Sequence, residues 1–230
     1  MEKSLSAAFG DSLKEESVAV ISELTEVTLD TIMEDGILKD IPIISTAIGL
    51  YKIGNSILER HNLKKLIVFL DGINKGTVDD KKRNQYRQRF QNDDKFRNQE
   101  IEYLLVLINR YIDYEKPKML AKLYLAYLDN EIEWNSVVMF STIIDILLPE
   151  DIAYLLTESP HVTHYNEINS SILRLVSVGL LLQTNNDSAV VYDGNGCFSV
   201  TTTSMSKIKT QEKIFGKTEL GKQLTDILKK

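Results

Sequence analysis

Two histidines three residues apart, in the segment HVTH, are the side chains whose types and spacing could most directly hold a metal ion. Together with Glu158, His161 and His164 would offer the nitrogen and oxygen ligands that zinc takes in proteins. The segment follows Pro160 instead of lying on an evident helix, and the sequence has no second cluster of such ligands. We therefore predict a surface loop here, with no metal ion and no cofactor.

Three carboxylates, Asp145, Glu150 and Asp151, could supply general acid–base chemistry. Helix caps and solvated turns explain the same residues equally well. The sequence contains no glycine-rich phosphate loop, no G-x-S-x-G motif and no cysteine–histidine nucleophile pair. We predict a protein that is not an enzyme.

The formal net charge of −6 hides a strong segregation of charge along the chain. Residues 1–59 carry 4 basic and 11 acidic side chains, a net charge of −7, and residues 100–230 carry 12 and 17, a net charge of −5. Residues 60–99 carry 11 basic and 5 acidic side chains, a net charge of +6. An acidic whole argues against broad nucleic-acid affinity, because phosphate binding needs clustered positive charge. The basic block keeps an anionic partner in consideration.

The densest part of that block, residues 77–92, has a helical pattern with few apolar positions. It is either a solvated surface helix or a docking face for nucleic acid, an acidic protein or lipid headgroups. The candidate anionic-partner surface combines this helix with lysines near the C-terminus: Lys81, Lys82, Arg83, Arg87, Arg89, Lys207, Lys209 and Lys213.

The apolar stretch 40–73 is the segment around which the other elements must pack. Its pattern predicts two helices, 41–58 and 63–73, joined by a turn at 59–62. The first is apolar nearly all round, which is typical of a core helix of a bundle. The alternative is a hairpin that inserts into a membrane after a trigger, although a spanning helix needs about 20 apolar residues. The residues that would serve either role are Ile43, Ile48, Leu50, Ile53 and Ile57.

The composition is that of a soluble globular protein, with 43% apolar and 26% charged residues. Cys197 is the single cysteine, so the chain has no internal disulfide framework. The first residues lack an apolar core of signal-peptide length. We expect a cytoplasmic protein, with a peripheral membrane location as the alternative.

The remaining pattern predicts a mainly helical chain whose elements are short and closely connected. Pro117 is taken as the boundary between two helices, and the tyrosines and Trp134 as core or edge packing in preference to a ligand cage. The predicted helices, besides those above, span residues 11–35, 95–115, 118–129, 134–148, 149–156 and 166–181.

Strand composition and turn residues appear only near the C-terminus. Residues 190–192, 198–203 and 213–216 are expected to be strands, and Thr218 is expected to cap a final helix. The fold class predicted is a multi-helix bundle at 1–160 with a small winged-helix-like α+β module at 166–230. The helix at 166–181 has Asn166, Asn169, Ser170 and Ser171 but only one basic residue, Arg174, which suits protein contacts better than DNA.

Two motifs resemble the Abi-alpha (abortive-infection alpha) proteins, a bacterial group associated with phage defence. LRLVSVGLL at 173–181 is similar to a "LxxLGLI" run, and IFGKTELG at 214–221 is similar to "yxLTxxG" with Lys217 in an apolar place. This likeness covers about residues 118–230 and carries over no catalytic residue. Residues 41–70 also resemble small bacterial proteins with an "IPxxxxxxxLYKxGxSIxxRxxLKKLxxFL" run, a group with no assigned activity.

These observations favour a non-enzymatic protein of bacterial defence or of host–phage interaction. In this hypothesis the C-terminal module or the basic helix senses a partner, expected to be a protein, and residues 41–73 act at an anionic membrane surface. The alternative is a nucleic-acid-binding regulator that uses the basic helix 77–92 and the C-terminal lysines. Salt dependence separates the two, because binding to several phosphates weakens steeply with salt.

Overall fold

The structure is a computed structural model of the 230-residue chain. It describes residues 57–76, 92–157, 161–164, 169–184 and 212–230, together with residues 81, 82, 85 and 88. The predicted helix 11–35, nearly all of the predicted helix 41–58, and the predicted strands 190–192 and 198–203 lie outside the described residues. The described part is mainly helical, with one small antiparallel sheet. Contacts divide the chain into two compact units, Met1–Pro149 with Lys230, and Glu150–Lys229.

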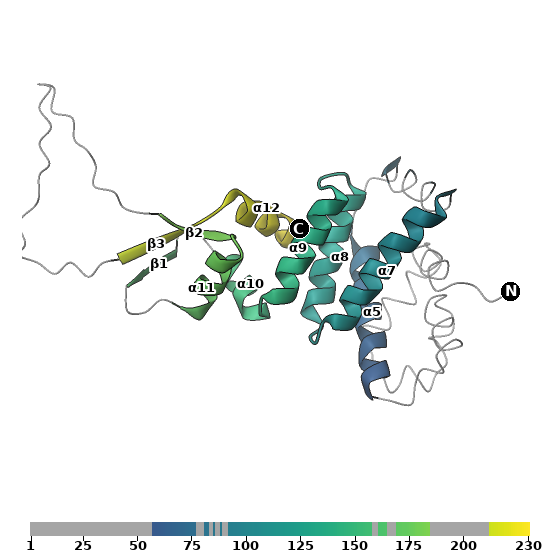
Figure 1. The fold of residues 1–230 in the computed structure, drawn as a ribbon, viewed down its shortest axis with the longest axis horizontal. Helices are drawn as coiled ribbons and strands as arrows, with labels where there is room; N and C mark the ends of the chain where they lie inside the picture. Colours follow the sequence, from purple (N-terminus) through teal and green to yellow (C-terminus); the bar gives the residue numbers. More distant parts are fainter. Residues whose placement is uncertain are drawn as a thin grey trace, which may run out of the picture. The chain divides into compact units, whose positions relative to one another are not determined.

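The described part of the first unit is a bundle of four helices (Figure 1). Helix α8 packs against both α5 and α9, and α5 also packs against α7. The buried core draws on α5, α7 and α8 and includes Phe69, Leu70, Leu104 and Tyr124. The helices are α5 (Ile57–Lys75), α7 (Asp94–Arg110), α8 (Glu115–Leu128) and α9 (Trp134–Ile146).

Helix α5 runs without interruption through residues 59–62, so the predicted turn there is wrong. The segment has no glycine or proline to break the helix, and His61 finds partners far along the chain. The His61 ring lies 2.8 Å from the Tyr114 hydroxyl through Nδ1 and 2.7 Å from the Ile112 carbonyl through Nε2. Helix α5, which covers residues 57–73 of the apolar stretch, packs into the core of the first unit, whereas the core-helix interpretation of 41–58 falls almost wholly outside the described residues.

The boundary between α7 and α8 differs from the prediction in two ways. Helix α7 ends at Arg110, short of the predicted residue 115, because the Asp113 carboxylate accepts the backbone N–H groups of Glu115 and Lys116 and so begins α8. Pro117 lies inside the first turn of α8 and does not separate two helices. A proline is tolerated there because its missing N–H would have no partner within the helix.

A lysine side chain is buried in the first unit. Lys65 is 1% exposed, and its ammonium donates to the carbonyls of Asn109 (3.0 Å) and Tyr111 (2.5 Å) at the end of α7. Burial lowers the pKa of the Lys65 ammonium, while the nearby Asp113 carboxylate opposes this effect. The lysine satisfies carbonyl groups that have no partner within α7.

The buried Tyr111 hydroxyl makes no hydrogen bond, as judged over the described residues. We expect Tyr111→Phe to raise the free energy of unfolding of the first unit by about 1 kcal/mol, because an unpaired buried polar group is removed and no hydrogen bond is lost. Urea unfolding followed by the fluorescence of Trp134, the single tryptophan, measures this. Tyr103→Phe is the control: its hydroxyl bonds Ser141 Oγ (3.1 Å) and the Val138 carbonyl (3.3 Å), so its loss should destabilise.

The same variant has a pH dependence with a defined sign. Burial, and then the nearby Asp145 carboxylate, raises the pKa of the Tyr111 hydroxyl. Above the ordinary tyrosine pKa of about 10, the unfolded chain therefore binds fewer protons than the folded chain, and stability falls as pH rises. Tyr111→Phe should lose less stability than the natural protein between pH 9 and about 11. An equal loss in both proteins would contradict this assignment.

The second unit contains three helices and a three-stranded antiparallel sheet within its described residues. The strand order is β1-β3-β2, so the last strand in sequence lies in the middle. His161 of β1 pairs with Phe215 of β3, and Leu181 of β2 pairs with Lys217 of β3. The elements are α10 (Pro149–Leu155), β1 (His161–His164), α11 (Ser170–Ser177), β2 (Leu181–Thr184), β3 (Glu212–Lys217) and α12 (Glu219–Lys229).

Two predictions about this unit are wrong. The HVTH segment is strand β1 and not a loop, because it pairs along its length with β3. Helix α11 is shorter than the predicted 166–181. It begins after Asn169, whose side chain accepts the N–H of Ser171, and it ends at Ser177, two residues before Gly179, which has a φ of +76°. The N–H of Leu180 reaches back to the Leu175 carbonyl, which closes the helix and frees the chain to start β2.

Other predictions about the second unit are confirmed. Helix α10 matches the predicted 149–156, and β3 contains the predicted strand 213–216. The Thr218 hydroxyl accepts the N–H of Gly221, so Thr218 caps α12 as the sequence indicates. Among the residues that the structure describes, no helix is long and apolar enough to cross a membrane.

Candidate partner-binding sites

The only basic residue of α11 is committed to holding the fold of the second unit. Arg174 donates from Nε and Nη2 to the two carboxylate oxygens of Asp151, with both distances 2.6 Å. The Asp151 side chain is fully buried. The bond to Asp151, followed by the charges of Asp151 and Glu150, raises the pKa of Arg174 against the opposing effect of burial. Arg174 is therefore bound within the second unit by this ion pair, and its side chain is 35% exposed.

Two apolar side chains of α11 are exposed on one side of the helix. Leu173 and Val176, three residues apart on one side of the helix, are 56% and 36% exposed. Their exposed neighbours on the helix are Ser170 and Ser177. We call these four residues the α11 face. Such a surface can bury apolar area against a protein but offers no cation to a phosphate.

The predicted anionic-partner surface is described only in part. The Lys82 ammonium bonds the Asp129 carboxylate (3.1 Å) and carbonyl (2.6 Å) at the end of α8, so it is occupied within the first unit. Lys81 is exposed, and Lys213 lies half-buried on β3. Arg83, Arg87, Arg89, Lys207 and Lys209 lie outside the described residues, as do Ile43, Ile48, Leu50, Ile53 and the side chain of Ile57.

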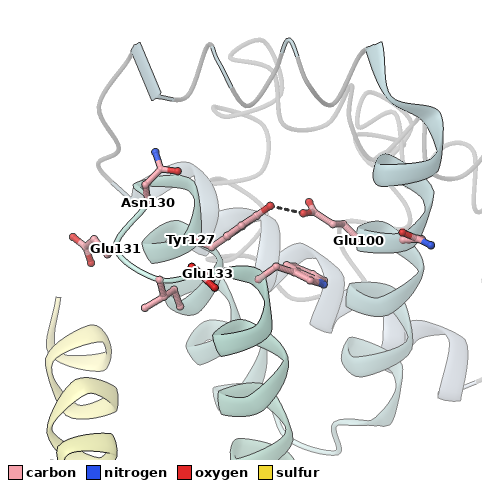
Figure 2. Close-up of a pocket in the computed structure, with 8 residues that line it drawn as sticks. Glu100, Tyr127, Asn130, Glu131 and Glu133 are labelled. Atoms are coloured by element: carbon pink, nitrogen blue, oxygen red, sulfur yellow. Dashed lines mark hydrogen bonds between the residues drawn. The ribbon is translucent and has the colours of Figure 1, made fainter.

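A pocket of about 700 Å³ opens in the first unit where α7 faces the turn between α8 and α9 (Figure 2). None of its described lining residues is basic, and three are glutamates. Its described walls are formed by Gln99, Glu100, Tyr127, Asn130, Glu131, Ile132, Glu133 and Trp134. The pocket thus combines carboxylates with aromatic rings.

The turn that forms one wall of the pocket depends on Asn130. This residue has a φ of +56°, a left-handed conformation that asparagine adopts more readily than most residues. The N–H groups of Asn130 and Glu131 then reach back to the carbonyls of Tyr127 and Ala126, which ends α8. Two residues later, Glu133 precedes α9 without making a side-chain capping bond.

The carboxylate of Glu100 is buried at this pocket, where it meets two tyrosines. It accepts the Tyr127 hydroxyl at 2.6 Å, and the Tyr124 hydroxyl lies 3.5 Å away. Figure 2 shows the Tyr127 hydroxyl pointing toward Glu100. The ring centroids of Tyr127 and Trp134 are 5.5 Å apart, so Tyr127 contacts both the Glu100 carboxylate and the Trp134 indole. Packing of Trp134 against Tyr103 and Tyr127 agrees with the predicted core or edge packing, but its place in the pocket was not foreseen.

The carboxylates considered for acid–base chemistry do not come together as a site in the described structure. Asp145 accepts the Arg110 guanidinium at 2.5 Å, Glu150 is exposed, and Asp151 is the buried partner of Arg174. Asp151 thus differs from the predicted cap or solvated turn. No group of three or more metal-binding side chains exists among the described residues, and the HVTH side chains lie outside them.

The described structure defines a mainly α-helical protein with a small antiparallel sheet. No protein-family model matches the sequence, and no significant match is found among curated proteins or solved structures.

Proposed function

We propose that this chain is a non-enzymatic interaction protein whose second unit is a winged-helix-like module that binds a protein partner through the α11 face. We further propose a role in bacterial defence against phage, on the basis of the Abi-alpha resemblance. The strand order β1-β3-β2, with α11 between β1 and β2, supports the winged-helix-like interpretation.

The observation that carries the proposal is the chemistry of α11. In a DNA-reading module this helix would bring cationic or amide side chains to base edges. Here its exposed side is Leu173 and Val176 between serines, and Arg174 is bound to Asp151. A partner that covers Leu173 and Val176 gains free energy by removing apolar area from water.

The two other hypotheses draw less support from the described residues. Nucleic-acid binding would rest on the predicted basic surface. Within that surface, Lys82 is paired with Asp129, and most of the other basic residues lie outside the described residues. Membrane action through residues 41–73 would require α5 to leave the bundle. That release would expose Leu66, Phe69 and Leu70, which are buried in the core.

Site-specific photo-cross-linking tests the proposal. A benzophenone amino acid at Val176, and separately at the exposed Lys222 of α12 as the matched control, is incorporated in bacteria before and after phage infection. We expect a discrete protein adduct from position 176 alone. Adding Leu173→Asp should lower the yield of the adduct from position 176 at least about tenfold, because the substitution places a charge in an apolar contact. A nuclease-sensitive adduct, or the same adducts from position 222, would contradict the proposal.

A further inference from the structure

We propose that the pocket between α7 and the α8–α9 turn binds the guanidinium group of an arginine from a basic peptide segment of a partner protein. This site lies in the first unit and does not depend on the α11 face. The proposal rests on three groups that line one cavity. They are the Glu133 carboxylate, which makes no capping bond, the Trp134 indole and the Tyr127 ring.

The charge of the pocket selects a cation. Two of the three glutamates already have partners. Glu131 is paired with the ammonium of Lys230, which belongs to the first unit, and the Glu100 carboxylate accepts tyrosine hydroxyls. Glu133 therefore supplies the carboxylate for a ligand, because it is exposed and makes no capping bond. No basic residue stands among the described lining residues to compete for it. The overall charge of −6 adds long-range attraction for a basic peptide.

The aromatic walls distinguish guanidinium from other cations. A guanidinium is planar, stacks on indole and phenol faces, and can bond a carboxylate through two N–H groups at once. Tyr127 and Trp134 lie tilted at 59° to one another, so a planar group can contact one ring by its face and the other by its edge. A volume of about 700 Å³ leaves room for the apolar stem of the arginine against Ile132.

Trp134 provides a direct readout because it is the single tryptophan and lines the pocket. The 230-residue chain is titrated with acetyl-glycyl-arginyl-glycine amide while the emission of Trp134 is recorded. The matched control peptide carries citrulline, which has the same shape without the charge. We expect saturable quenching with the arginine peptide, weaker binding at high salt, and no saturable response to the citrulline peptide.

Substitutions then locate the binding. Glu133→Gln should weaken the arginine peptide about fivefold, which is typical of losing one partly exposed ion pair. Glu102→Gln, on an exposed part of α7 outside the described pocket lining, should leave the affinity unchanged. Equal affinity in Glu133→Gln, or an equal response to citrulline, would overturn the proposal. Binding of spermidine without binding of the arginine peptide would overturn it too, since the ligand would then be a polyamine. Circular dichroism confirms that each variant is folded.

Discussion

Arg174→Met is expected to lower the thermal unfolding midpoint of the second unit by about 10 °C or more. The substitution keeps an unbranched side chain of similar length but removes the guanidinium that holds both Asp151 oxygens at 2.6 Å. Asp151 is fully buried, so its carboxylate cannot exchange the lost partner for water. Removing the guanidinium that pairs with a buried carboxylate is among the most destabilising changes that a single substitution can cause.

Two variants and two signals make this expectation specific. Lys222→Met removes an exposed ion pair with Glu219 in the same unit and should change the midpoint very little. The double variant Asp151→Leu with Arg174→Met should recover much of the lost stability, because apolar residues replace the whole pair. Circular dichroism follows both units, whereas Trp134 fluorescence follows the first. A double variant no more stable than Arg174→Met would contradict the assignment.

This ion pair also bears on what α11 can recognise. Arg174 is the residue that would first be assigned to phosphate contact from the sequence, because it is the only cation on the helix. Its pairing with Asp151 depends on α10, 23 residues earlier in the chain, and no local pattern indicates that contact. What is left on the exposed side is Leu173 and Val176, which favours a protein partner.

Helical periodicity and end signals predicted much of the described fold. The apolar repeats gave α9 and α10 within two residues of their observed ends, and Thr218 marked the start of α12. These elements were predictable because their apolar residues repeat at helical spacing, and because Pro149 begins α10 and Thr218 caps α12. The turn predicted at 59–62 was wrong because one of its polar residues, His61, is held within the helix by a contact with Tyr114, some 50 residues away.

The sheet and the pocket were not predictable for a related reason. Strands β1 and β2 are four residues each, and their pairing with β3 involves residues about 30 to 50 positions apart. The pocket joins Glu100 on α7 to Glu133 after α8, and nothing in the local pattern brings them together. The one signal available was Asn130, whose type and place after an apolar helix suit a left-handed turn.

Gly72→Ala is the second large effect that we expect, with the free energy of unfolding of the first unit falling by about 2 kcal/mol. Helices α5 and α8 approach so closely that a Cβ on Gly72 would lie 2.7 Å from the Ala121 Cβ. Ala121 is fully buried, so the strain cannot be relieved by turning a side chain toward solvent. The helices must separate, which loosens the contacts of Phe69 and Tyr124 in the same core.

Exchanging the two residues tests whether this contact is the cause. Ala121→Gly alone should destabilise by about 1 kcal/mol, because glycine weakens a helix interior. The double variant Gly72→Ala with Ala121→Gly places one methyl group at the crossing, as in the natural protein, and should regain nearly its full stability. Urea unfolding of all four proteins gives the coupling energy between the positions. If the two losses simply add, the methyl groups do not meet, and the crossing of α5 and α8 is wider than the structure places it.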